Sequence, residues 1–217
     1  MPEYFDVIVI GGGLAGLAAA RTASLGGATV LVLEAHGGGG RARTTTRDGF
    51  SFNLGGHALY VGGAGGEALA ALSVRPDGSL PPLGRYQLFK DGRLEVMPST
   101  AGTLARWGLL SWRSKAQLGA VLAWLAKIDA SGLAGTSMEQ WLQGLELRSD
   151  VEDVVRALVR LSTYCADMSA LGADAGVAQL QLGGSSGVLY LHGGWGQLLA
   201  ALGAGQQVRT HSAVGAL

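Results

Sequence analysis

Three glycines and one carboxylate near the N-terminus have the types and spacing needed to hold a diphosphate and a ribose. Gly11, Gly13 and Gly16 follow the spacing G-x-G-x-x-G directly after an apolar run, residues 5–10. Glycines at these positions permit a tight turn, let phosphate oxygens approach the backbone, and allow a helix to pack closely on a strand. Glu34 follows a second apolar run, where a carboxylate accepts hydrogen bonds from ribose hydroxyls and disfavours a 2′-phosphate.

The elements expected around these residues are a strand, a helix and a second strand. Residues 5–10 are almost wholly apolar and rich in β-branched side chains, as in a strand buried within a parallel sheet. Leu14 and Ala15 open a helical pattern whose positive N-terminal end points at the phosphates, and residues 28–33 form the second strand. This order predicts an α/β, Rossmann-like nucleotide-binding domain.

Further glycine-rich motifs follow the carboxylate. Ala35 begins the sequence AHGGGGRARTTT, and the sequence GFSFNLGGHALY starts at Gly49. The combined pattern, in which the fingerprint is followed by E-A, G-G-R and F-x-x-G-G-H, resembles the superfamily of flavin-dependent amine oxidases, protoporphyrinogen oxidases and phytoene desaturases. The resemblance implies FAD as the cofactor and hydride transfer from the substrate to the flavin.

The resemblance also assigns positions of this chain to parts of FAD. It implies that Glu34 binds the adenosine ribose, that the G-G-R turn wraps the diphosphate, and that the G-G-H stretch lies beside the flavin. Backbone N–H groups and a guanidinium both suit a diphosphate. No catalytic residue is assigned, and no metal site is expected. The fingerprint and the resemblance together predict cofactor contacts at Gly11, Gly13, Leu14, Ala15, Gly16, Glu34, Ala35, Gly39, Gly40, Arg41, Gly55, Gly56, His57 and Val214.

Two of these assignments have open alternatives. Arg41 can also belong to a solvated basic turn without a ligand. His57 is a candidate acid or base, although the hydride chemistry implied by the resemblance favours a role in shaping the pocket. The chain departs from the family at His36, where an arginine is usual.

Changes in composition divide the chain into a nucleotide-binding part and an insertion. Glycine and proline cluster at residues 62–66 and 75–83, and the Asp91-Gly92 dipeptide predicts a hairpin turn. Helical patterns then dominate until the chain returns as a strand, a short helix and a strand. We expect the first part of an FAD-binding domain at 1–74, a mainly helical substrate or cap insertion with a hairpin at 75–186, and a return to the FAD-binding domain at 187–217.

The expected nucleotide-binding sheet is incomplete. In a doubly wound sheet the first strand lies in the middle, with the second strand on one side and later strands on the other. The resemblance places those later strands, and the segment that holds the flavin ring, beyond Leu217. Residues 5–10 are therefore expected to present an unpaired edge, which invites association. We expect a truncated enzyme, or one part of a split enzyme whose FAD domain is completed by a second chain.

Composition excludes several classes of partner. Sixteen basic and sixteen acidic residues cancel, so the chain has no electrostatic basis for binding nucleic acid. Cys165 is the only cysteine, which excludes an intrachain disulfide and a cysteine-based metal site and fits a cytoplasmic location. Because the first strand begins close to Met1, we expect no signal peptide.

A tryptophan-rich helix leaves peripheral membrane contact open. Residues 112–128 have helical spacing, but their uninterrupted apolar stretch is too short to span a bilayer. Trp107, Trp112 and Trp124 have cationic residues nearby. They can dip into a membrane surface or belong to an amphipathic helix packed on its own domain.

These observations predict an FAD-dependent oxidoreductase with a small-molecule substrate of the amine, polyene or tetrapyrrole class. The sequence FNLGGHALY and the tryptophan-rich helix favour a phytoene desaturase-like member. The alternative is a non-catalytic nucleotide- or partner-binding subunit that uses only the adenosine half of the site. A third interpretation is an NAD-dependent dehydrogenase, because Glu34 suits NAD equally well, although the G-G-R and G-G-H stretches argue against it.

Overall fold

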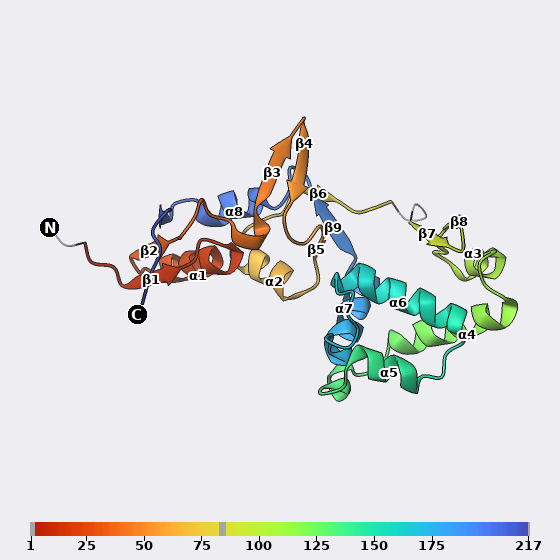
Figure 1. The fold of residues 1–217 in the computed structure, drawn as a ribbon. Coiled ribbons are helices and arrows are strands. Elements are labelled where there is room, and N and C mark those ends of the chain that lie inside the picture. The colour runs from red at the N-terminus through yellow and green to blue at the C-terminus, as the bar shows by residue number, and fades with distance from the viewer. Residues whose placement is uncertain (1–2, 83–85, 217) are drawn as a thin grey trace. The chain divides into compact units, whose positions relative to one another are not determined.

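The chain folds into two compact units. The computed structural model describes residues 3–82 and 86–216. Unit 1 consists of Met1–Leu80 and Val188–Leu217, and unit 2 consists of Pro81–Gly187 (Figure 1). Unit 1 is therefore built from two separate stretches of sequence, and unit 2 is inserted between them.

A three-stranded parallel sheet forms the centre of unit 1. Strands β1 (Val7–Ile10), β2 (Val30–Leu33) and β10 (Gln207–Arg209) lie in the order β1-β2-β10. Helix α1 (Leu14–Leu25) connects β1 to β2 and packs along both strands. This strand-helix-strand unit confirms the α/β class expected from the apolar runs.

The core of unit 1 comes from apolar side chains that the sheet and its helices share. Val30 and Val32 of β2 are buried, as are Leu17 and Ala20 of α1. Leu198 and Leu202 of α8 (Gly196–Gly203) are almost fully buried against the same cluster. The second stretch of unit 1 thus supplies both a strand and a helix to the nucleotide-binding core.

Strand β1 has one unpaired edge among the described residues. It pairs only with β2, and its side chains alternate in exposure. Ile8 is 56% exposed and Ile10 is 51% exposed. An exposed apolar strand edge is a template for pairing with further strands. The unpaired edge predicted from the sequence is therefore present.

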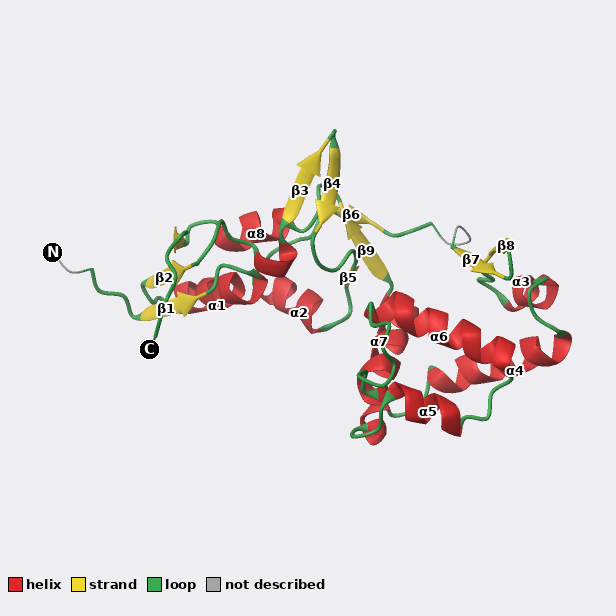
Figure 2. Cartoon of the chain, viewed as in Figure 1, coloured by secondary structure: helices red, strands yellow, loops and turns green. Residues whose placement is uncertain are grey.

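Short strands and one helix connect the central sheet of unit 1 to the insertion. The β3–β4 hairpin follows a single 3₁₀ turn, and β9 pairs antiparallel with both β5 and β6 (Figure 2). These elements are η1 (Gly40–Ala42), β3 (Thr44–Arg47), β4 (Phe50–Asn53), β5 (Leu59–Tyr60), α2 (Ala64–Ala71), β6 (Gly78–Ser79) and β9 (Val188–Leu191).

Unit 2 begins with a hairpin and continues as helices. Asp91 and Gly92 join the two hairpin strands and have φ angles of 51° and 75°. Two left-handed residues are what a type I′ turn requires, so the predicted turn is confirmed. The elements are β7 (Gln87–Lys90), β8 (Arg93–Val96), α3 (Ala101–Arg106), α4 (Trp112–Leu125), η2 (Ala130–Leu133), α5 (Met138–Gly144), α6 (Ser149–Thr163) and α7 (Ala173–Ser186).

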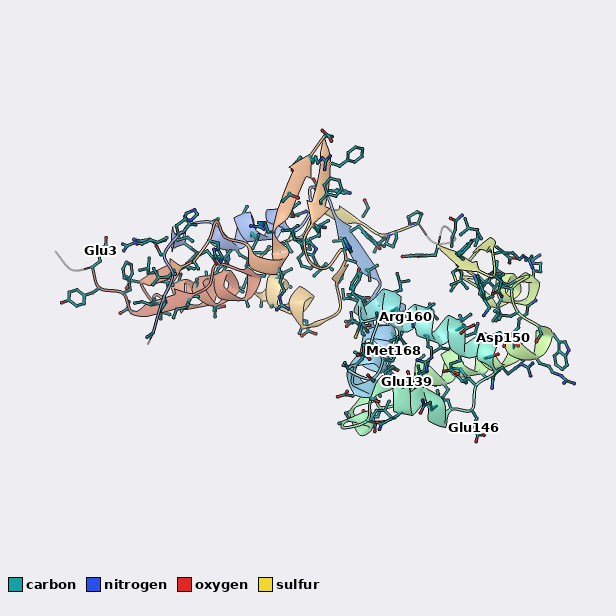
Figure 3. All side chains as sticks on the ribbon, in the orientation of Figure 1. Glu3, Glu139, Glu146, Asp150, Arg160 and Met168 are labelled. Atoms are coloured by element: carbon teal, nitrogen blue, oxygen red, sulfur yellow. The ribbon has the colours of Figure 1, made fainter. Side chains whose placement is uncertain are left out.

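Ion pairs and hydrogen bonds connect helices α5 and α6 of unit 2. Arg156 of α6 donates to Glu139 of α5 at 2.6 Å and to Glu152 of its own helix at 2.8 Å. The hydrogen bonds from Arg156 lower the pKa of the Glu139 carboxyl. Glu139 also donates its N–H to the carbonyl of Met168 at 3.0 Å; both residues are labelled in Figure 3.

We predict that truncating one core leucine of unit 2 is costly. Leu142 is 1% exposed, so Leu142→Ala should lower the free energy of unfolding by about 2–5 kcal/mol through lost burial and a cavity. Leu161 of the same unit is 54% exposed, and Leu161→Ala should change it by less than about 0.5 kcal/mol. Urea unfolding followed by circular dichroism measures both values. Equal losses in the two variants would contradict the assignment of the core.

Candidate dinucleotide site

The glycine-rich turn leaves β1 in a conformation that favours glycine. Gly11 has a φ of +103°, in the left-handed region that L side chains rarely adopt. Its N–H donates to the carbonyl of Leu33 at 2.7 Å, which ties the turn to the end of β2. A Cβ added to Gly16 would overlap the carbonyl oxygen of Gly11. Helix α1 can therefore approach the turn only because Gly16 has no side chain.

The N-terminus of α1 suits an anion. Gly13 is the N-cap residue, and among the described residues it leaves the first turn of the helix without a side-chain cap. That turn also contains no acidic residue. Uncapped N–H groups at a helix N-terminus, together with the helix dipole, bind phosphate groups. The residues present therefore fit a dinucleotide diphosphate.

Glu34 is buried and shapes the turn with both of its carboxylate oxygens. It is 8% exposed; Oε2 accepts the Gly12 N–H at 2.7 Å and Oε1 accepts the His36 N–H at 2.8 Å. The hydrogen bonds from His36 and Gly12 lower the pKa of the Glu34 carboxyl. A carboxylate has about four acceptor positions, so a ribose hydroxyl can still donate to it.

Gly12 is a site residue that the sequence analysis missed. Besides donating to Glu34, it accepts a hydrogen bond from the Gly39 N–H at 3.1 Å through its carbonyl oxygen. The backbone of this one residue thus connects the carboxylate, the fingerprint and the G-G-R turn. The fingerprint treats this position as variable, and the only signal was a third consecutive glycine.

The G-G-R turn lies against the fingerprint. Gly39 and Gly40 have φ angles of 86° and 51°, and a Cβ added to Gly40 would lie 3.9 Å from Cα of Gly13. Arg41 follows in the 3₁₀ turn η1 and is exposed. A Cβ added to Gly55 would overlap the carbonyl oxygen of Arg41. The first glycine of G-G-H therefore packs on the same turn.

The C-terminal residues of unit 1 reach the carboxylate side of the site. The N–H of Ser212 donates to the carbonyl of Glu34 at 2.9 Å, and that of His211 donates to the carbonyl of His36 at 3.1 Å. Val214, predicted to contact adenine, is half-buried and lies two residues beyond this pairing. The structure therefore brings these two distant segments of the chain together beside Glu34.

Of three further residues predicted to bind the cofactor, two have exposed side chains and the third, a glycine, lies near the Trp195 ring. Ala35 and His57 are exposed. A Cβ added to Gly56 would lie 3.9 Å from the Trp195 ring. The contacts that the structure shows at the site therefore gather around the fingerprint, Glu34 and the G-G-R turn.

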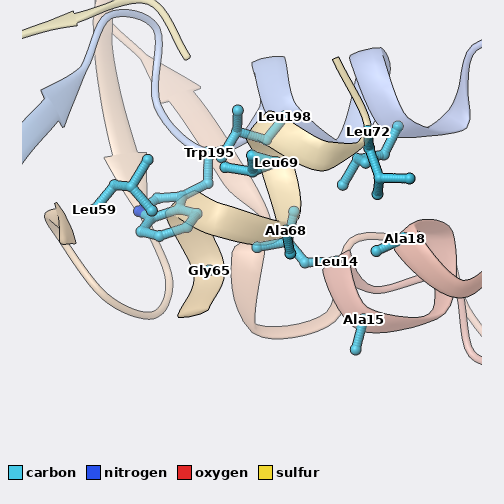
Figure 4. Close-up of a pocket in the computed structure, with 11 residues that line it drawn as sticks. Leu14, Ala15, Ala18, Leu59, Gly65, Ala68, Leu69, Leu72, Trp195 and Leu198 are labelled. Atoms are coloured by element: carbon cyan, nitrogen blue, oxygen red, sulfur yellow. The ribbon is translucent and has the colours of Figure 1, made fainter. Parts of the chain in front are cut away.

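An apolar cavity of about 220 Å³ lies between α1, α2 and α8 in unit 1 (Figure 4). Leu14, Ala15 and Ala18 of α1 line one side, and Leu198 and Trp195 line another. Because the side chains of Leu14 and Ala15 line this cavity, only their backbone N–H groups are suited to bind a diphosphate. The indole Nε1 of Trp195 is buried and has no hydrogen-bond partner among the described residues.

A family comparison identifies this arrangement. The family model for the flavin containing amine oxidoreductase matches residues 14–217. The chain belongs to the flavin-containing amine oxidoreductase family. FAD, the cofactor predicted from the sequence, is thereby confirmed as that of the family, and the family and fold class predicted from the sequence are confirmed with it.

Individual relatives are similar over different parts of the chain. It is 46% identical over 63 residues, 29% of this chain and 10% of the relative, to the all-trans-retinol 13,14-reductase of Homo sapiens. It is 44% identical over 59 residues, 27% of this chain and 10% of the relative, to prolycopene isomerase 1, chloroplastic, of an Oncidium hybrid cultivar. Putrescine oxidase bound to putrescine superimposes with a TM-score of 0.68 at 20% identity, covering 95% of this chain and 51% of that structure. The chain thus spans about half the length of this solved structure.

We predict that Glu34 contributes to stability in a pH-dependent way. Glu34→Gln should lower the free energy of unfolding of unit 1 by about 1.5–3 kcal/mol at neutral pH, because hydrogen bonds to a charged acceptor are lost. Since folding lowers the pKa of Glu34, the carboxylate's contribution is complete above its ordinary value of 4.5 and disappears as the pH falls through the folded value. Urea unfolding of the wild type and of Glu34→Gln between about pH 7 and about pH 3 measures how the difference in their free energies of unfolding changes with pH.

A matched control uses another glutamate of unit 1. Glu67 is exposed on α2, so Glu67→Gln should change the free energy of unfolding by less than about 0.5 kcal/mol. A difference between wild type and Glu34→Gln that stays constant across the pH range would contradict the role assigned to the carboxylate.

Proposed function

We propose that this chain holds the adenosine diphosphate part of FAD in an oxidoreductase that acts on a conjugated polyene. The observation that carries the proposal is the meeting of three elements at Gly12: the buried Glu34 carboxylate, the uncapped N-terminus of α1 and the G-G-R turn. Few functions other than nucleotide binding need a cradle of glycines at an uncapped helix N-terminus.

Each part of the cradle has a separate task. The first-turn N–H groups of α1 bind diphosphate oxygens, and the exposed Arg41 adds a charge-assisted contact. The remaining lone pairs of Glu34 accept a ribose hydroxyl. The flavin, when bound, supplies the hydride acceptor, and the protein's part is to bind and orient it.

The polyene class is supported by the relatives with the higher identity. Retinol and prolycopene, named in the two matches of 46% and 44% identity, are both conjugated polyenes. Putrescine is an amine, but at 20% identity that likeness shows only the fold. Among the amine, polyene and tetrapyrrole classes, the polyene class therefore has the most direct support.

We further propose that additional polypeptide completes the FAD domain. The solved relative is about twice as long, and β1 offers an unpaired edge with Ile8 and Ile10 exposed. The apolar cavity beside Leu14 and Ala15 is a further surface that an apolar segment could cover. Further strands on β1 and a packed apolar segment over the cavity would bury these surfaces, whether they belong to the same protein or to a second chain.

Calorimetric titration with ADP and with FAD tests the cradle. Both should bind with affinities within about threefold of each other, because only the shared diphosphate end is gripped. Gly16→Ala should weaken both by about tenfold or more, since its Cβ would overlap Gly11. Gly65→Ala on α2 is the control, because nothing lies within 4 Å of the added atom.

The same titration separates the alternatives. FAD binding much tighter than ADP binding, with stoichiometric reducible flavin, would contradict the need for a completing segment. ADP binding without any flavin-dependent oxidation after a completing chain is added would favour the non-catalytic nucleotide-binding subunit. If neither ADP nor FAD binds, the proposal is overturned.

A further inference from the structure

Helix α4 of unit 2 has a packed face and an opposite, exposed face. Ser114, Leu118 and Leu125 are buried against the core of unit 2. Residues on the opposite side of a helix repeat at intervals of three and four. The α4 outer face, as we name it, consists of Trp112, Ala116, Ala120 and Ala123, all exposed.

The outer face contains no charged side chain, yet it is exposed. An exposed helix face normally carries polar and charged side chains, while apolar residues face the core. Here three alanines and a tryptophan occupy the exposed side. Leu122 and Trp124 extend the apolar surface and are 38% and 43% exposed. Exposed apolar side chains gathered on one helix face mark an interaction site.

The charged residues in the segment that carries this face are all positive. No aspartate or glutamate occurs from Val96 to Ile128, whereas this segment holds Arg106, Arg113, Lys115 and Lys127. The Arg113 guanidinium lies over the Trp112 ring, 5.3 Å from its centroid. Cations beside a helical apolar face favour a negatively charged partner.

The three tryptophans of this region differ in exposure, and only the exposed ones can contact a partner. Trp112 is 73% exposed, and Trp124 stacks on Trp141 with the ring centroids 5.9 Å apart. Trp107, which the sequence analysis grouped with them, is 5% exposed and belongs to the core of unit 2. Tryptophan suits the membrane interface because its ring is apolar and its N–H is polar.

We infer that the α4 outer face docks on an anionic lipid surface, with the helix lying in the plane of the interface. Trp112 and the alanines enter the boundary between headgroups and acyl chains, and Arg113 and Lys127 reach the anionic headgroups. None of the helices within residues 3–82 and 86–216 is long and apolar enough to cross a membrane. The contact is thus peripheral, and it is independent of the proposed FAD chemistry.

Sedimentation with vesicles tests this inference on the full chain. Vesicles of equal parts phosphatidylcholine and phosphatidylglycerol should bind the protein, and vesicles of phosphatidylcholine alone should bind it at least about tenfold more weakly. The double variant Ala116→Glu/Ala120→Glu should lose binding to the anionic vesicles, because it places two carboxylates at the centre of the face. Arg113→Gln should weaken binding by about fivefold.

A matched control lies on another helix of unit 2. Ala178 is exposed on α7, so Ala178→Glu adds the same charge to an exposed helix position and should leave vesicle binding unchanged within about twofold. Circular dichroism of each variant confirms that unit 2 is folded. Brominated lipid should quench tryptophan emission in the wild type and quench it less in Trp112→Phe.

Two results would overturn the inference. Equal binding to neutral and anionic vesicles would show that the cations do not contribute. Absence of vesicle binding, together with a dimer in analytical ultracentrifugation that Ala116→Glu/Ala120→Glu dissociates, would show that a second copy of the chain covers this face instead.

Discussion

A buried carboxylate holds the candidate dinucleotide site of unit 1 in shape. Both oxygens of Glu34 accept backbone N–H groups, and Gly12, which donates one of them, accepts the Gly39 N–H of the G-G-R turn through its carbonyl oxygen. A buried charge is tolerated only where it is hydrogen-bonded or paired. The end of β2, the fingerprint and the second glycine turn are therefore fixed together, and preorganised N–H groups lose less entropy when an anion binds.

The sheet that carries this site depends on residues far away in the sequence. The second stretch of unit 1 supplies β10, which pairs with β2, and α8, which packs on α1. Asn53 and Thr44 of the β3–β4 hairpin accept the N–H groups of Trp195 and Gly196 at the start of α8. The proposed site for the adenosine end is thus complete only after the chain has returned from the insertion, while β1 keeps an edge that no described strand pairs with.

Unit 2 has a tightly packed core and, on helix α4, an apolar face that is exposed. Val151, Val155 and Val159 of α6 are fully buried, and Arg156 between them bridges α5 and α6. Helix α4 covers this core with one face and leaves alanines and Trp112 exposed on the other. The outer face is not part of this core, and the membrane contact proposed for it would account for its apolar character.

The sequence by itself determined the α/β class, the fingerprint turn, the Asp91-Gly92 hairpin and the family, because strand runs, glycine spacing and turn dipeptides are local patterns. Tertiary structure decided what local patterns do not encode. Gly12 became a site residue through contacts with Glu34 and Gly39, and Trp107 became core although Trp112, five residues later, is exposed. Both outcomes depend on which distant segments pack together, and packing between distant segments has no period in the sequence.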